Sequence, residues 1–347
     1  MRNRKEETPS AAGKQPYNMN KRKIWMLLLL IVLCCPLGNA QGFLIHENMS
    51  QTFESIRDIK GSYQHVYHLK LAAQNLQEIP KEVKEMPNLY TLLLSDNKIT
   101  TLGDALTNAS KLKVLDLDNN DLREIPIAVL KSCAQLEELD IRGNNIKNVP
   151  TDLGHLKYLK VLDIGDNKVA SLDSALYLPY LTKFRADANQ LETVPTFLRQ
   201  CKNLEYLNLN QNRISDLHSI SRLNRLRTLN IGDNPLASLA PVAELGDLEH
   251  LTLDWIDLDT VSQTGLERLK KLRILSIENC NLQQIPGWIA ALTNLQELSL
   301  IGNNLSEIPP ALYQMKRLKK LWLGKNPLPQ EQVDDLRRKL KQCEVNF

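Results

Sequence analysis

The sequence predicts an α/β fold, a right-handed solenoid in which about twelve repeated units build one parallel, concave sheet. Leucines recur in the pattern L-x-x-L-x-L-x-x-N-x-L, and successive units begin 22 to 24 residues apart. Alternate leucines of a unit, such as Leu115 and Leu117, point to the same side of a strand. A single unit cannot enclose that apolar side, so neighbouring units must stack on one another. The units begin at Val66, Leu89, Leu112, Leu136, Leu159, Leu181, Leu204, Leu226, Leu248, Leu272, Leu295 and Leu318.

Residues 1–40 have the features of an export signal. A basic stretch is followed by the apolar residues 24–35 and then by the small residues Gly38 and Ala40. We expect residues 1–40 to be a signal peptide that is cleaved after Ala40, with Met19 as an alternative start. The apolar stretch is shorter than the ~20 residues that span a bilayer, so we expect no stable transmembrane span after cleavage. An uncleaved anchor and a lipidated leader are the less favoured alternatives.

The net charge argues against a nucleic-acid partner. The formal charge of the whole chain is +3, but residues 1–40 hold seven Lys or Arg and only two Glu. The remaining residues, 41–347, therefore carry a formal charge of −2. A domain that binds nucleic acid usually has a strongly basic patch or overall charge, so we predict no nucleic-acid binding.

The solenoid needs a cap before its first unit, because the apolar end of a repeat stack must be covered. We assign residues 41–65 to this cap and residues 66–328 to the repeats. Apolar residues recur at helical spacing ahead of Gly61, which predicts a helical N-terminal cap. These apolar residues are Met49, Phe53 and Ile56.

The last residues, 329–347, predict a C-terminal cap made of a helix and a strand. Val333, Leu336 and Leu340 fall on one helical face, and the residues after them alternate between apolar and polar up to Phe347. A helix followed by a final strand would cover the last unit and continue the sheet.

Asparagine recurs at the turn that follows each expected strand. Its amide can both donate to and accept from backbone groups that would otherwise be buried without a partner, which predicts a ladder of asparagines along the solenoid. Ile256 and Cys280 take this position in two units. The ladder residues are Asn97, Asn120, Asn144, Asn167, Asn189, Asn212, Asn234, Asn303 and Asn326.

This repeat pattern resembles the leucine-rich repeat family, and the resemblance covers about four-fifths of the chain. Six units continue into Ile-Pro or Val-Pro and are similar to the 23-residue class of scaffold-type and bacterial repeats. The other units look more like the 22-residue internalin-type repeat, and the C-terminal ending is similar to that of secreted bacterial members. The resemblance implies a horseshoe-shaped scaffold, and it implies a function only as a class, noncovalent binding.

Signatures of catalysis and metal binding are absent from the sequence. It contains no G-x-S-x-G, H-E-x-x-H or C-x-x-C motif, and none of its six histidines recurs at ligand spacing with Cys or carboxylates. We therefore predict a protein that is not an enzyme and that has no cofactor and no metal site. The cysteines beyond the leader are expected to be free thiols.

Residues two, four, six and seven places after the start of each unit are expected to line the concave face. The fourth-place residues are Lys70, Leu93, Asp116, Asp140, Asp163, Arg185, Asn208, Asn230, Thr252, Ser276, Ser299 and Trp322. The sixth-place positions add Asp118, Arg142, Asp187, Asn210, Asp254 and Glu278. These residues predict an acidic first half and a polar, aromatic second half. The aspartates would either attract a basic partner or cation, or keep an exposed strand soluble, and the second interpretation is favoured.

The ninth unit departs from the others, because Ile256 replaces the turn asparagine and Trp255 precedes it. Two interpretations are open. Trp255 is a binding anchor, since tryptophan presents a large apolar area with a polar handle and is enriched among binding hot spots. Alternatively, Ile256 packs inward and Trp255 covers a turn that has lost its ladder bond, which is the slightly favoured interpretation.

We therefore predict an exported protein that binds a protein partner, of unspecified identity, on the concave face of units six to nine. The alternatives are a carbohydrate-binding or adhesin-like envelope protein and a structural spacer or oligomeric element. The expected location is secreted or in the cell envelope, either periplasmic or at the surface. The contact residues that we expect are Arg185, Asp187, Tyr206, Asn208, Asn210, His250, Asp254 and Trp255.

Overall fold

The computed structural model describes residues 51–347. The expected signal peptide and the first ten residues of the expected N-terminal cap, which include Met49, lie outside the described residues. Among the residues that are described, no helix is both long enough and apolar enough to cross a membrane.

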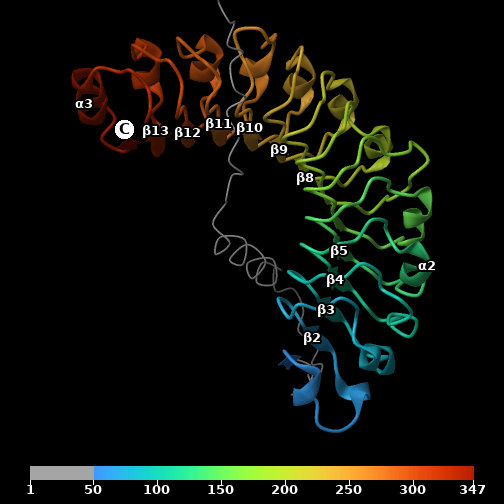
Figure 1. Ribbon diagram of the computed structural model, residues 1–347. Helices are drawn as coiled ribbons and strands as arrows, with labels where there is room; N and C mark the ends of the chain where they lie inside the picture. The colour runs from blue at the N-terminus through green and yellow to red at the C-terminus, as the bar shows by residue number, and fades with distance from the viewer. Residues whose placement is uncertain (1–50) are drawn as a thin grey trace, which may run out of the picture. The chain divides into compact units, whose positions relative to one another are not determined.

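One sheet of fourteen parallel strands follows the sequence order and lines the inner side of an arc (Figure 1). Twelve of the strands, β2 to β13, each begin two residues after one of the unit starts. The strands are β1 (Thr52–Phe53), β2 (His68–Lys70), β3 (Thr91–Leu93), β4 (Val114–Asp116), β5 (Glu138–Asp140), β6 (Val161–Asp163), β7 (Lys183–Arg185), β8 (Tyr206–Asn208), β9 (Thr228–Asn230), β10 (His250–Thr252), β11 (Ile274–Ser276), β12 (Glu297–Ser299), β13 (Lys320–Trp322) and β14 (Glu344–Asn346).

The outer side of the arc carries short helices, most of which are single turns (Figure 1). The α-helices within residues 51–347 are α2 (Ile127–Leu130) and α3 (Gln330–Lys339). The 3₁₀ helices are η2 (Ile56–Asp58), η3 (Tyr63–His65), η4 (Lys81–Glu85), η5 (Thr151–His155), η6 (Thr196–Gln200), η7 (His218–Arg222), η8 (Ala240–Glu244), η9 (Leu266–Arg268), η10 (Gly287–Ala291) and η11 (Pro310–Gln314).

The core lies between the sheet and these outer turns. The middle residue of each repeat strand is buried while its two neighbours face the concave side, as the alternation along a strand requires. In register, Leu115 of β4 pairs with Leu92 and Leu139 on the adjacent strands, so equivalent residues stack from unit to unit. Phe184 replaces leucine in β7 and packs edge-to-face on Phe197 at a centroid distance of 5.6 Å. Stacking therefore joins the apolar sides of all units into one core.

Each unit turns sharply just after its strand, at a residue with a positive φ angle. The φ values lie between 47° and 70°, in the left-handed region that asparagine, aspartate and glycine tolerate best. These residues are Ala73, Asp96, Asn119, Gly143, Asp166, Ala188, Gln211, Asp233, Trp255, Asn279, Gly302 and Lys325. Trp255 has by far the largest side chain of the twelve.

The turn asparagines bond to backbone groups of their own unit and of the preceding unit. Asn120, for example, accepts from the Ile99 amide at 2.9 Å, and its Nδ2 donates to the carbonyls of Leu94 and Leu117 at 3.0 and 3.1 Å. The other eight ladder asparagines make the equivalent bonds. At Cys280 the thiol donates instead, to the Leu253 carbonyl at 3.2 Å, and Ile256 makes no such bond because its side chain is apolar.

The N-terminal cap differs from the expected helix. Within the described residues it consists of strand β1, which pairs with β2 through Thr52 and His68, followed by the short turns η2 and η3. The side chains of Ser55 and Ser62 accept from the amides of the residues two places later and start these turns. The prediction of a helix was wrong because the open edge of the first repeat strand can be paired by a strand, which helical spacing of apolar residues does not reveal.

At the other end, α3 buries Val333 and Leu336, and β14 pairs with β13 and extends the sheet. Four cysteines of the described region, Cys133, Cys201, Cys280 and Cys343, are buried and unpaired. Burial raises the pKa of the first three thiols to about 12.

Candidate functional site

The concave face is built from in-register columns of side chains. Asp116, Asp140, Asp163 and Arg185 stand on adjacent strands and pair with one another in that order. Neighbouring parallel strands are ~4.8 Å apart, so these charged groups are brought close together although more than twenty residues separate them in the chain. The sheet therefore converts a repeated position in the sequence into a continuous charged surface.

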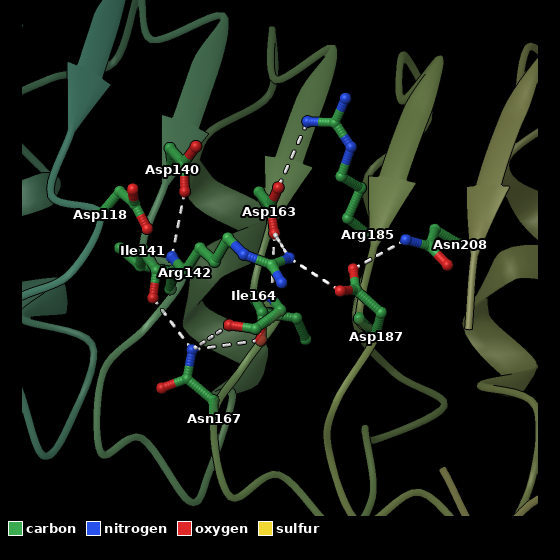
Figure 2. Close-up of polar contacts among 12 residues, drawn as sticks. Asp118, Asp140, Ile141, Arg142, Asp163, Ile164, Asn167, Arg185, Asp187 and Asn208 are labelled. Atoms are coloured by element: carbon green, nitrogen blue, oxygen red, sulfur yellow. Dashed lines mark hydrogen bonds and ion pairs between the residues drawn. The ribbon is translucent and has the colours of Figure 1, made fainter. Parts of the chain in front are cut away.

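Two arginines neutralise the centre of the acidic half (Figure 2). Arg142 lies 2.8 Å from an Asp187 oxygen and 3.9 Å from an Asp163 oxygen, while Arg185 lies 3.3 Å from the other Asp163 oxygen. Only 3% of Asp163 and 8% of Asp187 is exposed. Asn208 donates to Asp187 Oδ1 at 2.9 Å. The two carboxylates are thus buried and paired. They do not keep an exposed strand soluble, which was the interpretation favoured from the sequence.

Gly165 makes room for this network. A Cβ atom at this position would collide with the Arg142 guanidinium and lie 3.0 Å from carboxylate oxygens of both Asp163 and Asp187. The absence of a side chain therefore allows Arg142 to reach across the intervening unit to Asp187.

The remaining aspartates of the acidic half are short of counter-charge. Burial, and secondarily Asp116, raises the pKa of Asp118 to about 7. Burial also raises the pKa of Asp140, and Asp163 and Asp116 raise it further. Asp118 Oδ1 is buried and has no hydrogen-bond partner within residues 51–347. This part of the face therefore carries less negative charge near neutral pH than its composition implies.

Five of the expected contact residues form one connected group on β7, β8 and the turns that follow. The Arg185 guanidinium lies 5.1 Å from the centre of the Tyr206 ring, a cation–π contact. Asp187 accepts from Asn208, and Asn208 Oδ1 in turn accepts from the Asn210 amide at 3.2 Å. These contacts hold a charged, aromatic and amide-bearing surface in one arrangement.

The other three expected residues lie on β10 and the turn after it. His250 is half-buried on the strand. Asp254 Oδ1 accepts from Ser276 Oγ at 2.7 Å and from the Glu278 amide at 2.8 Å. Burial raises the pKa of Asp254, although these two bonds oppose the rise. No hydrogen bond or ion pair between described residues joins this group directly to the group on β7 and β8, and β9 lies between them.

Trp255 is exposed and is held in an unfavourable backbone conformation. Its φ angle is 62°, and 62% of the residue is accessible to solvent. Its amide donates to the Glu278 carbonyl at 2.9 Å, while the neighbouring Ile256 is only 1% exposed. Ile256 therefore packs inward, but the indole ring does not bury itself over the turn. Neither backbone preference nor burial explains a tryptophan at this position.

The sequence columns contained Arg142 and Asp163, yet neither was among the residues favoured for binding, and Gly165 was missed. The signal that could have identified them is a glycine at the sixth place between Arg142 and Asp187 in the same column. Among the described residues, no cluster of three or more His, Cys, Asp or Glu has a geometry that could hold a metal ion.

Family profiles match most of the repeat region. A profile described as a leucine-rich repeat region matches residues 105–234, and three further leucine-rich repeat profiles match residues 64–122, 271–292 and 293–338.

Curated relatives are distant and longer than this chain. The flightless-1 homolog of Caenorhabditis elegans is 27% identical over 254 residues, which cover 72% of this chain and 18% of that protein. Osteomodulin of Bos taurus is 25% identical over 72% of this chain and 55% of its own length. The chain thus spans less than two thirds of either relative.

Solved structures share the fold. An internalin from Listeria monocytogenes superposes with a TM-score of 0.65 at 22% identity, over 82% of this chain and 87% of that one. A chain of the LRIM1/APL1C complex superposes with a TM-score of 0.57 at 20% identity, over 79% of this chain and 55% of that one.

Proposed function

The chain belongs to the leucine-rich repeat proteins, and from that premise we propose that it is an exported protein without enzymatic activity that binds a protein partner. The proposed contact surface is the concave face from β7 to β10. Export is proposed from the basic, apolar and small-residue segments of residues 1–40.

Trp255 is the observation that carries this proposal. A bulky residue at positive φ costs on the order of 1 kcal/mol or more, whereas the glycine or asparagine found at the same turn of other units adopts this conformation at little cost. Trp255 as a whole residue is 62% exposed, so burial within the chain does not offset this cost. Exposed aromatic side chains are the usual anchors of protein interfaces, where they bury a large apolar area and lose little conformational entropy.

The connected group on β7 and β8 supports the same surface. Arg185, Tyr206 and Asn208 are already fixed by contacts with one another and with the paired aspartates. Because the side chains are ordered before a partner arrives, less conformational entropy is lost on binding. A protein partner would contact this ordered group and Trp255 across β9.

The test uses Trp255→Asn and Tyr206→Ala in crosslinking capture from envelope and secreted fractions. Asparagine tolerates the left-handed conformation, so Trp255→Asn should raise the free energy of unfolding by about 1 kcal/mol while it abolishes capture. Tyr177→Ala is the matched control, because Tyr177 is 55% exposed but does not occupy a concave-face position of its unit. Urea unfolding of each variant accompanies the capture experiment.

Equal capture by the wild type and the Trp255→Asn variant would contradict the proposed site. A large loss of stability in that variant would show instead that the tryptophan packs. Capture that survives digestion of the fractions with protease would replace the protein partner by a glycan on the same face.

A further inference from the structure

The edge of the sheet where the strands begin has an unusual composition at β11, β12 and β13. We name the residues one and three places before these strands the strand-start edge. Arg273, Gln296 and Lys319 directly precede the three strands. Their backbones are bonded in series, from the Gln296 amide to the Arg273 carbonyl at 2.8 Å and from the Lys319 amide to the Gln296 carbonyl at 2.7 Å. Side chains of successive units are therefore held ~4.8 Å apart along this edge.

The residues two places earlier in the chain form a second column beside the first. Asn294 Nδ2 donates to the Lys270 carbonyl at 2.6 Å, which directs the amide oxygen of Asn294 toward Arg317. Arg317 donates to that oxygen, Asn294 Oδ1, so one side of the guanidinium is fixed. The arginine is thus held in place by an uncharged group that leaves its positive charge uncompensated.

The two columns enclose a hollow of about 190 Å³. Its walls are Glu249, Lys271, Arg273, Asn294, Gln296 and Arg317. A larger hollow of about 620 Å³ shares two of these residues, and its walls are Gln296, Lys316, Arg317, Lys319 and Gln342. Gln296 and Arg317 line both hollows, so the two hollows adjoin at this pair of side chains.

Positive charge dominates these walls, which hold five cations and a single carboxylate. That carboxylate, Glu249, is already engaged at 3.0 Å by Arg227 and at 3.6 Å by Arg273. Lys271 is paired outside the hollow, with Asp247 at 2.7 Å. Within residues 51–347, no carboxylate lies within ion-pair distance of the three remaining cations, which are Lys316, Arg317 and Lys319.

The same edge is neutralised elsewhere in the solenoid. Directly before β4, β5 and β6 stand Lys113, Glu137 and Lys160, and Glu137 lies 2.9 Å from the first lysine and 2.6 Å from the second. Charge alternates along this column at these strands, so both lysines have a carboxylate partner. At β12 the alternation stops, because Gln296 stands where the next acid would be expected, and Lys319 before β13 follows without an acidic neighbour in this column on the β12 side.

We propose that the strand-start edge of β11 to β13 binds an oxyanion group, a phosphate or a sulfate, with Arg273, Gln296, Arg317 and Lys319 as its donors. The planar fork of arginine matches the tetrahedral oxyanion and donates to two of its oxygens. The Gln296 amide adds a neutral donor. The smaller hollow lies below the ~300 to 1,000 Å³ of pockets for drug-sized ligands, so it fits the anionic group, and the larger hollow takes whatever the group is attached to.

The first test is calorimetric titration of the purified protein with sodium phosphate and with sodium sulfate, against sodium chloride at equal ionic strength. We expect saturable binding of at least one oxyanion and no saturable binding of chloride. Arg317→Gln should weaken that binding at least tenfold. Arg123→Gln is the matched control, because it removes the same charge from an exposed position far from this edge and should leave binding unchanged.

A second arm distinguishes a free oxyanion from one that is part of a lipid headgroup, by flotation with phosphatidylglycerol vesicles and with phosphatidylcholine vesicles. Saturable phosphate binding without flotation supports a free small anion, and both results together support a headgroup. Absence of saturable binding overturns the site, as does flotation that Arg317→Gln and Arg123→Gln reduce equally. Trp255→Asn should leave oxyanion binding intact, so this result is independent of the proposed partner on the concave face.

Discussion

The first and second halves of the concave sheet use charge in opposite ways. From β4 to β8, aspartates and two arginines bond to one another, and the carboxylates are half-buried or fully buried. From β9 to β13 the face is mostly polar and uncharged, the asparagine ladder is interrupted at Ile256, and Trp255 projects into solvent. Asp163, Asp187 and the two arginines of the first half are therefore committed to contacts with one another, while the second half leaves Trp255 exposed.

This difference teaches that a charged column in a repeat sequence is not by itself a binding surface. Arg142 and Asp187 form an ion pair that reaches across the unit between them. Burial raises the pKa of Asp118 to about 7, so this carboxyl is only partly ionised near neutral pH. The residue that we propose as the anchor for a partner, Trp255, is instead one whose exposure the fold does not explain.

The largest effect is expected when a residue of the asparagine ladder is replaced, and Ile256, which interrupts the ladder, provides the comparison. Asn120→Ile puts an isoleucine at the turn-asparagine position of a unit in the first half, as Ile256 does naturally in the ninth unit. It leaves several backbone groups unpaired, among them the Ile99 amide and the Leu94 carbonyl, and should lower the free energy of unfolding by about 3 to 4 kcal/mol. Ile256→Val, in the interrupted unit, should cost about 1 kcal/mol. Urea unfolding measures both, and similar losses would show that the ladder bonds contribute little.

A smaller effect separates paired charges in the network from paired charges at the surface. Arg142→Ala leaves the buried carboxylates of Asp163 and Asp187 without one of their cations. Because a third of the Arg142 side chain is exposed, the expected loss is about 2 kcal/mol, less than for a fully buried pair. Arg227→Ala breaks the ion pair of Arg227 with Glu249, which has a similar length of 3.0 Å. Because the Arg227 side chain is 60% exposed, the expected loss of unfolding free energy is about 0.5 kcal/mol or less. Thermal and urea unfolding that rank the two variants in the reverse order would refute the distinction.

The smallest expected effect is a pH dependence that belongs to the first half. The folded pKa of Asp118 is about 7, above its ordinary value of 3.8, so the folded protein retains a proton that the unfolded chain releases. The contribution of Asp118 to stability therefore falls as the pH rises from about 4 to about 7.

Asp118→Asn removes this ionisation. The free energy of unfolding of the variant should therefore be about 1 to 2 kcal/mol higher than that of the wild type at pH 7 and nearly equal to it at pH 4. Urea unfolding at the two pH values gives the comparison. If the free energy of unfolding of the variant differs from that of the wild type by the same amount at both pH values, Asp118 acts through packing and not through its ionisation.

Much of this protein could be predicted from its sequence, because a repeat fold relates each residue to the same place in every unit. The spacing of the leucines predicted the strands and their core residues, and the turn asparagines fell where the backbone needs both a donor and an acceptor. The inward packing of Ile256 followed from its chemistry alone. These features depend on local position and on the nearest neighbouring unit.

Only the tertiary structure decided which columns interact with one another and which remain free. Whether Arg142 reaches Asp187 depends on the path of a long side chain across Gly165, and the expected cap helix gave way to a strand because an open sheet edge could be paired. The exposure of Trp255 and the hollow beside Arg317 likewise follow from how neighbouring units stack. The period of the sequence determines where each residue stands, but burial and pairing are properties of the assembled surface, where side chains more than twenty residues apart compete for the same contacts.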